Sequence, residues 1–313
     1  MKDFLLAATL LIQQPNFKES LEACIEEGLQ NTQEDETERN LDILKSHGLA
    51  ELGKFEASRI NVNYYITASA QNIIDTGNFD IQGESFSLDR FLDFIEDKFR
   101  NNIGYFQDIA NRRNINELHL VIEDFGEERA NNISVAIINT RIIKIDVRRW
   151  HKLYLGRRQY LANLTSIHEF THINNYILDN DEVKLHRELS AIIFESLSYI
   201  KNEGEPAYIH AYLRNVAGNL ESPENILNEE YSGMVPLRHL AHYFIENIIN
   251  GGYAVEGNKI EKLEDFAYSY LADSENGDKG FDDACLAMGI KDSNNNRITL
   301  EKVRNDLYQQ LRE

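Results

Sequence analysis

Cysteine is scarce in this chain of 313 residues, which contains only Cys24 and Cys285. The two residues lie far apart and neither is one of a closely spaced pair, so they can build neither a disulfide framework nor a thiolate zinc site. A zinc ion bound by this protein must therefore be held by histidine and carboxylate side chains.

Long apolar runs are also absent, because no segment approaches the ~18 consecutive apolar residues that span a bilayer. A short apolar stretch from Phe4 to Ile12 superficially resembles a signal peptide. Asp3 precedes it and no convincing small-residue cleavage site follows, so the stretch is interpreted as an amphipathic first helix. The sequence therefore predicts no transmembrane segment, and it leaves a cytoplasmic protein or one exported by another route as the alternatives.

Positive charge is outnumbered, since 32 Lys and Arg residues stand against 52 Asp and Glu residues and give a net charge of -20. Phosphate backbones and anionic membrane surfaces bind local excesses of Lys and Arg, which no segment supplies strongly. We therefore expect no nucleic-acid partner. The length and the hydrophobic fraction of 42% are those of a folded globular protein with one large domain or two lobes around a cleft.

The first part of the chain, residues 1–84, carries the weakest signals. Helical spacing from Leu21 to Leu29 predicts a helix, the highly charged segment from Gln33 to Asn40 predicts a connector, and the apolar run from Ile60 to Ile66 predicts a strand. No chemistry can be assigned to this region. We expect it to pack against the rest of the protein, with regulation or substrate docking as the alternative.

The middle of the chain combines two helices with a small sheet. Ser87 is a suitable N-cap for a helix whose apolar positions run from Leu88 to Phe99. β-Branched residues in the ranges 118–122 and 133–147 predict two or three strands, the last two of which form a hairpin. Helical spacing then returns from Leu161 to Ile177.

This second helix carries the segment His168-Glu169-Phe170-Thr171-His172. Histidines four residues apart lie on one face of a helix, so both imidazoles can bind a single zinc ion. Glu169 lies about 100° further round the helix, where its carboxylate can accept a proton from zinc-bound water. The alternative is that two core or surface histidines match the pattern by chance.

A catalytic zinc ion needs a third protein ligand, and the next carboxylates considered are Glu182, Glu188 and Glu195. We expect Glu188 to be the ligand, because it opens an apolar helical segment whose first turn can cross the motif helix. Glu195 lies on the same helical face further along and is better suited to contact a ligating histidine. His186 is expected to be a surface or structural residue.

These residues resemble the gluzincin metallopeptidases, in which a HExxH helix is completed by a glutamate on the next helix. The family commonly begins its third-ligand segment with Glu-x-x-Ala, and Glu188-Leu189-Ser190-Ala191 is similar. Ile192 stands where thermolysin-like members have an aspartate, so any carboxylate behind the ligands must come from elsewhere, such as Glu195. The resemblance covers roughly residues 85 to 313. It does not imply exopeptidase activity, because the chain lacks a Gly-Ala-Met-Glu-Asn segment.

The same resemblance implies a role for Tyr231. Tyr231-Ser232-Gly233, followed by an apolar helix, resembles the aminopeptidase-like gluzincin pattern, in which the tyrosine stabilises the oxyanion. That pattern usually has two residues between Tyr and Gly, whereas one is present here. His239 and His242 are the alternative donors.

Together these expectations give an α+β protein with a zincin-like lobe at residues 85–180, which contains a small mixed β-sheet and the HEFTH helix. A mainly helical lobe at residues 181–313 follows and supplies the third ligand, with the substrate in the cleft between them. The expected activity is that of a zinc-dependent metallohydrolase that cleaves a peptide or protein substrate, with Glu169 as general base. The alternative is a catalytically inactive zincin-like or acidic helical protein that binds a partner.

Overall fold

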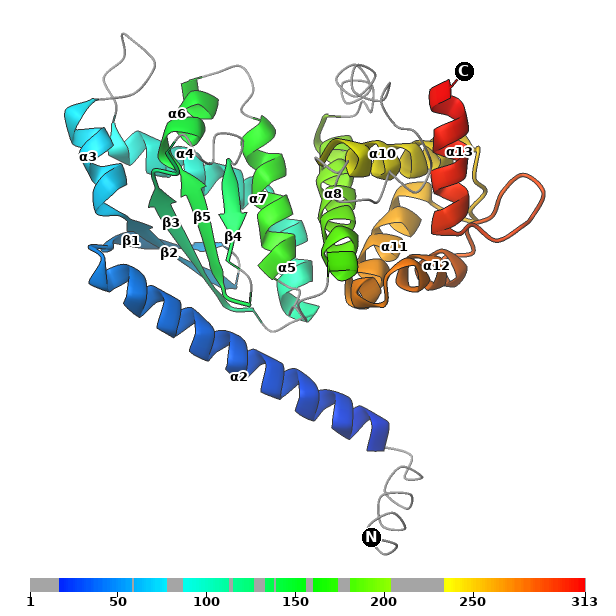
Figure 1. Ribbon diagram of the computed structural model, residues 1–313, viewed down its shortest axis with the longest axis horizontal. Helices are drawn as coiled ribbons and strands as arrows, with labels where there is room; N and C mark the ends of the chain where they lie inside the picture. The colour runs from blue at the N-terminus through cyan, green and yellow to red at the C-terminus, as the bar shows by residue number, and fades with distance from the viewer. Residues whose placement is uncertain are drawn as a thin grey trace, which may run out of the picture.

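The computed structural model describes residues 17–57, 59–77, 87–112, 115–126, 133–137, 139–155, 160–173, 181–203 and 234–312. In these ranges the chain has a mixed α+β fold (Figure 1). The sheet-containing part comprises α2 (Phe17–Ser46), β1 (Ala50–Ala57), β2 (Ile60–Ile66), α3 (Ala68–Thr76), α4 (Leu88–Asn101), α5 (Ile103–Arg112), β3 (Glu117–Glu123), β4 (Ser134–Ala136), β5 (Ile142–Asp146), α6 (Val147–Leu155) and α7 (Tyr160–Ile173). The helical part comprises α8 (Asp181–Glu203), α10 (Met234–Asn250), α11 (Lys259–Asp273), the short 3-10 helix η3 (Ser274–Asn276), α12 (Asp278–Ala287) and α13 (Leu300–Arg312). Among the described helices, none is long and apolar enough to cross a membrane.

Five strands form one mixed sheet in the order β1-β2-β3-β5-β4. β1 is antiparallel to β2, the pairs β2-β3 and β3-β5 are parallel, and β4 is antiparallel to β5. The predicted strand at residues 60–66, the strand near 118–122 and the hairpin within 133–147 are thus confirmed. β1 is an additional strand, and through β1 and β2 the N-terminal region forms part of the same sheet that precedes the motif helix.

Helices cover both faces of the sheet. Successive residues of a strand point to opposite sides, so neighbouring positions on one strand belong to different apolar clusters. On one face Leu120 and Ile145 belong to the large apolar core that includes Phe170 of α7. On the other face Val121 lies in a smaller cluster with Leu41 of α2. The motif helix therefore packs on the larger core, opposite α2.

The helix α4 begins where its sequence predicts. The hydroxyl of Ser87 accepts a hydrogen bond from the backbone nitrogen of Arg90 at 3.4 Å, which caps one of the free amides of the first turn. Phe91, Ile95 and Phe99 follow at helical spacing and are all buried. The amphipathic pattern thus fixes which side of α4 faces the core.

The segment from Gln33 to Asn40 was predicted to be a connector, and this prediction is wrong. These residues lie within α2, which is continuous over 30 residues. Thr37 and Leu41, four residues apart, are buried, while most of the charged side chains around Thr37 face solvent. A charged segment with one narrow buried stripe is still a stable helix, because Glu, Gln and Arg have high helix propensity when solvated.

Aromatic side chains form the centre of the helical part. Phe244 of α10, Phe266 and Tyr270 of α11 and Phe281 of α12 contact one another with ring centroids 4.8 to 5.8 Å apart. The helix α8 lies between this cluster and α7, so α7 and α8 are neighbours where the two parts meet (Figure 1).

Candidate metal centre

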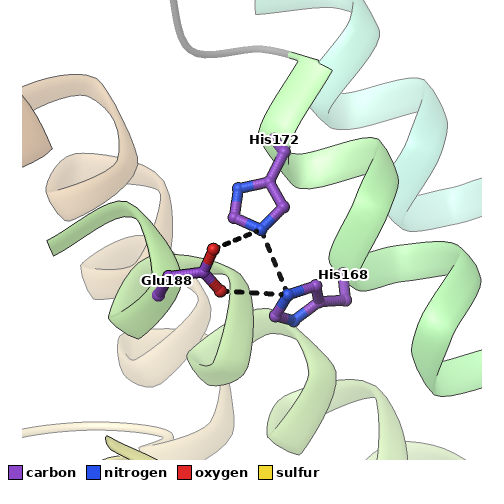
Figure 2. A group of neighbouring side chains, drawn as sticks. All are labelled: His168, His172 and Glu188. Atoms are coloured by element: carbon purple, nitrogen blue, oxygen red, sulfur yellow. Dashed lines mark hydrogen bonds and ion pairs between the residues drawn. The ribbon is translucent and has the colours of Figure 1, made fainter. Parts of the chain in front are cut away.

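The helix α7 presents His168 and His172 on the face that it turns toward α8 (Figure 2). Their Nε2 atoms lie 3.1 Å apart and the two rings are nearly perpendicular, at 83°. The four-residue spacing on an uninterrupted helix produces this convergence, as the sequence predicts. The predicted continuation of α7 from residue 174 to 177 lies outside the described residues.

Glu188 of α8 completes the group. Its Oε2 lies 3.3 Å from His168 Nε2, and its Oε1 lies 3.4 Å from His172 Nε2. Among the residues that the structure describes, these three side chains form the group able to share a cation, with one donor atom of each within 4.8 Å of the others. One detail of the expectation is wrong: Glu188 is not in the first turn of its helix, because α8 already begins at Asp181.

The donor spacing can be compared with that around a tetrahedral zinc ion. Ligand atoms bound at about 2.0–2.1 Å to such an ion lie about 3.3–3.4 Å apart. The two Nε2 atoms, 3.1 Å apart, agree with that value within a few tenths of an ångström. Each nitrogen lies 3.3 or 3.4 Å from a different oxygen of Glu188, and a set with one donor atom from each residue lies within 4.8 Å. In addition, Glu188 Oε2 is inaccessible to solvent and has no hydrogen-bond donor of suitable geometry, which a bound cation would remedy.

The three side chains of the group differ in their exposure to solvent. The side chain of His168 is 9% exposed, whereas those of His172 and Glu188 are 19% and 25% exposed. Solvent therefore reaches the side chains of His172 and Glu188 more than that of His168.

The electrostatics of the group show a need for positive charge. Burial alone would lower the pKa of His168, but the carboxylates of Glu188 and Glu195 prevail and raise it to about 10. Burial alone would raise the pKa of Glu188, but the rings of His172 and His168 hold it well below its usual range. The carboxylates around the rings thus favour a positive charge at this point, and a divalent cation would supply it.

Glu195 lies behind His168, away from the donor group. Its Oε2 is 3.3 Å from His168 Nδ1, an ion-pair contact without the alignment of a hydrogen bond, and 3.1 Å from a terminal nitrogen of Arg238. Burial would raise the pKa of Glu195, but Arg238 and His168 together hold it below its usual range. The expected contact between Glu195 and a motif histidine is therefore present.

Glu169 does not join the donor group and instead faces the edge strand β4. Its Oε2 accepts a hydrogen bond from the backbone nitrogen of Ala136 at 2.7 Å. The amide of Ile137 and the carbonyl of Ile133 both bond to β5, so the amide of Ala136 lies at an alternate position and points away from the sheet. One carboxylate oxygen of Glu169 is thus bound to the sheet edge while the other makes no hydrogen bond among the described residues.

The structure does not place the other candidate residues in the donor group. His186 is 2% exposed and contacts α11 and α12, which agrees with a structural residue. His239 and His242 are buried on α10, and His242 Nε2 lies 3.4 Å from the hydroxyl of Ser196 on α8. Tyr231 lies outside the described residues, so its role stays a prediction.

Sequence reasoning assigned no role to Arg238 or to Ala136. Arg238 is preceded by a leucine and followed by a histidine, and no charge pattern marks it as the partner of a glutamate 43 residues away. Ala136 contributes a backbone amide, which every residue except proline possesses, so residue type gives no signal there.

Sequence comparisons identify no family for this chain. The sequence matches no protein-family model, and no curated protein shows a significant match to it.

Proposed function

We propose that this protein is a zinc-dependent hydrolase of peptide bonds in which His168, His172 and Glu188 hold the metal ion. The observation that carries the proposal is the convergence of these three side chains, whose Nε2 atoms lie 3.1 Å apart and each within 3.4 Å of a Glu188 oxygen. Two histidine nitrogens and one carboxylate form a typical ligand set for catalytic zinc, whereas calcium and magnesium favour oxygen ligands alone.

The partial exposure of His172 and Glu188 leaves room for a fourth ligand, as catalytic zinc requires. A zinc ion at this position would polarise a substrate carbonyl group and acidify a water molecule. Glu169, held at Oε2 by the sheet edge, would accept a proton at its other oxygen and return it to the leaving amine.

Glu195 and Arg238 support the ligands in this proposal. A carboxylate beside the Nδ1 atom of a ligating histidine fixes the ring orientation and increases the basicity of its Nε2 atom. Arg238 favours the ionised form of Glu195, which is the form that serves this purpose.

The choice of a peptide substrate rests on the likeness of the whole arrangement to gluzincins. A HExxH helix packs on a small mixed sheet, and the next helix contributes a glutamate to the same point. We therefore assign this chain a zincin-like architecture as part of the proposal, with the catalytic group at the meeting point of α7 and α8.

Metal content tests the first half of the proposal. Wild type should retain one zinc ion per chain after dialysis against a weak chelator, whereas His168→Ala and Glu188→Ala should lose it while staying folded by circular dichroism. His47→Ala is the matched control, because His47 is an exposed histidine in the turn after α2 and its loss should leave the zinc content unchanged. Wild type that cannot be loaded with zinc would refute the proposal.

Peptide cleavage tests the second half. Zinc-loaded wild type and Glu169→Gln should be incubated with a diverse peptide mixture, and new termini should be identified by mass spectrometry. Cleavage by wild type alone, with equal zinc content in both proteins, supports a metallopeptidase. Equal zinc content without cleavage by either protein would favour the partner-binding alternative.

A further inference from the structure

Three consecutive residues of α8 face three different parts of the protein. Glu188 faces the histidines of α7, Arg187 is 3% exposed and lies in the electrostatic field of Glu275 in η3, and His186 is 2% exposed. Successive residues of a helix are rotated by about 100°, so His186 and Glu188 point to nearly opposite sides of α8. Contacts of His186 therefore act on the side of the helix away from the donor group.

His186 is bound through both ring nitrogens. Its Nδ1 lies 2.8 Å from the hydroxyl of Tyr270 on α11, and its Nε2 lies 3.2 Å from Oδ1 of Asp278 on α12. Asp278 Oδ2 in turn accepts a bond from Arg304 of α13 at 2.8 Å. This polar cluster, formed by the buried His186 and Tyr270 with the partly exposed Asp278 and Arg304, ties α8 to three helices that are distant in sequence.

A carboxylate, an imidazole and a hydroxyl in a row also occur in catalytic relays, but this row is closed to substrate. Tyr270 is 0% exposed, and its ring packs against Phe266 and Phe281. Burial raises the pKa of its hydroxyl well above the ordinary value, so it is no nucleophile. A hydroxyl on one side of the ring and a carboxylate on the other instead define one orientation of the His186 ring.

We propose that His186 and Asp278 are positioning residues of the metal centre, which fix the rotation of α8 about its axis and thereby the place of Glu188. A side-chain atom about 5–6 Å from a helix axis moves by about 1 Å when the helix turns by about 10°. Metal sites tolerate deviations of about 0.2 Å in ligand distance. The contact on the far side of α8 is therefore needed to hold Glu188 Oε1 and Oε2 at 3.3 to 3.4 Å from the two histidines.

The inference rests on the proposed zinc site, and zinc affinity is its readout. Competition with a chromogenic chelator should show that Asp278→Asn and His186→Gln bind zinc about 10-fold or more weakly than wild type, which is the size of effect known for residues that orient ligands. Tyr270→Phe, which keeps the ring and removes one hydroxyl, should give a smaller loss in the same direction and serves where the other two variants do not fold.

Two matched controls separate positioning from general destabilisation. Asp283 lies on the same helix as Asp278, α12, and forms an exposed ion pair with Arg297. Asp283→Asn removes this pair and should leave zinc affinity at the wild-type value. Tyr253→Phe removes a buried tyrosine hydroxyl that binds Asp306, so it should lower the urea resistance of the metal-free protein without lowering zinc affinity.

The outcomes are distinct. Wild-type zinc affinity in folded Asp278→Asn and His186→Gln overturns the positioning role and leaves the proposed function standing. A loss of affinity in Tyr253→Phe as large as in Asp278→Asn also overturns it, because stability alone then governs binding. Wild type that binds no zinc refutes the proposed function, and the positioning role is then refuted with it.

Discussion

The carboxylate of Glu169 is bound to the backbone amide of Ala136, 33 residues earlier in the chain, through a hydrogen bond of 2.7 Å. That amide belongs to the outer edge of β4 and takes no part in the ladder with β5. The edge strand therefore orients the glutamate that we propose as general base, without contributing a side chain.

Replacing Ala136 by proline removes this one donor. Proline is tolerated on edge strands where the missing amide is not part of the ladder. We expect Ala136→Pro to keep its zinc and to lose about 10-fold or more in kcat, because general-base catalysis contributes about 10²- to 10⁴-fold. Steady-state kinetics on a cleaved peptide, together with zinc content, measure both quantities.

Ala136→Ser serves as the control for that experiment, since serine keeps the amide and is nearly as small. It should retain the wild-type kcat. A folded Ala136→Pro protein with the same kcat as wild type would show that the bond to Glu169 has no part in catalysis.

Glu195→Gln probes the support behind His168. The amide has nearly the shape of the carboxylate but no negative charge, so Nε2 of His168 becomes a weaker donor to the metal. We expect zinc affinity to fall by about 10- to 100-fold, as for other groups that contact a ligating histidine. Chelator competition measures the change, and Glu56→Gln, on an exposed residue of β1, should show none.

Two relations at the donor group follow from local rules, which is why the sequence predicts them. His168 and His172 converge because any helix brings positions four apart together. Glu195 lies seven residues after Glu188, so one helix carries both carboxylates on the same side, one at the donors and one behind His168. Each of these relations needs only the knowledge that the segment is helical.

Relations between distant segments could not be predicted in this way. The partners of His186 come from two helices that begin more than 70 residues later, and nothing in their composition indicates that Asp278 faces a histidine rather than solvent. The same holds for α2, whose charged middle segment looks like a connector until the sheet face beneath Thr37 and Leu41 is known.

Gln33 of α2 connects the N-terminal region to the end of the motif helix. Its side-chain nitrogen donates to the carbonyl of Ile173 at 2.8 Å and to that of Thr140 at 3.3 Å. We expect Gln33→Ala to reduce the free energy of unfolding by about 1 to 3 kcal/mol, because two partly buried carbonyl groups lose their donor. Urea denaturation measures the change.

The control is Gln71→Ala, which removes an exposed hydrogen bond to Asp75 and should change the free energy of unfolding by less than about 0.5 kcal/mol. Equal stability of the two variants would mean that Gln33 does not hold α2 against the end of α7.

The final prediction concerns pH and the buried His119 on the face of the sheet that α2 covers. Burial lowers the pKa of His119, with Arg141 and Lys45 acting in the same direction and Glu117 against them. The folded protein therefore favours neutral His119, whereas the unfolded chain takes up a proton as the pH falls below about 6.5. Proton binding to the unfolded chain then favours unfolding. His119 therefore leaves the free energy of unfolding unchanged above that pH and lowers it increasingly below that pH, until the folded protein is protonated as well. Urea unfolding of wild type and His119→Gln between pH 7.5 and pH 5 should show wild type losing more stability than the variant, while groups common to both proteins cancel in the difference. Parallel stability curves for the two proteins would mean that His119 has the same proton affinity in the folded and unfolded states.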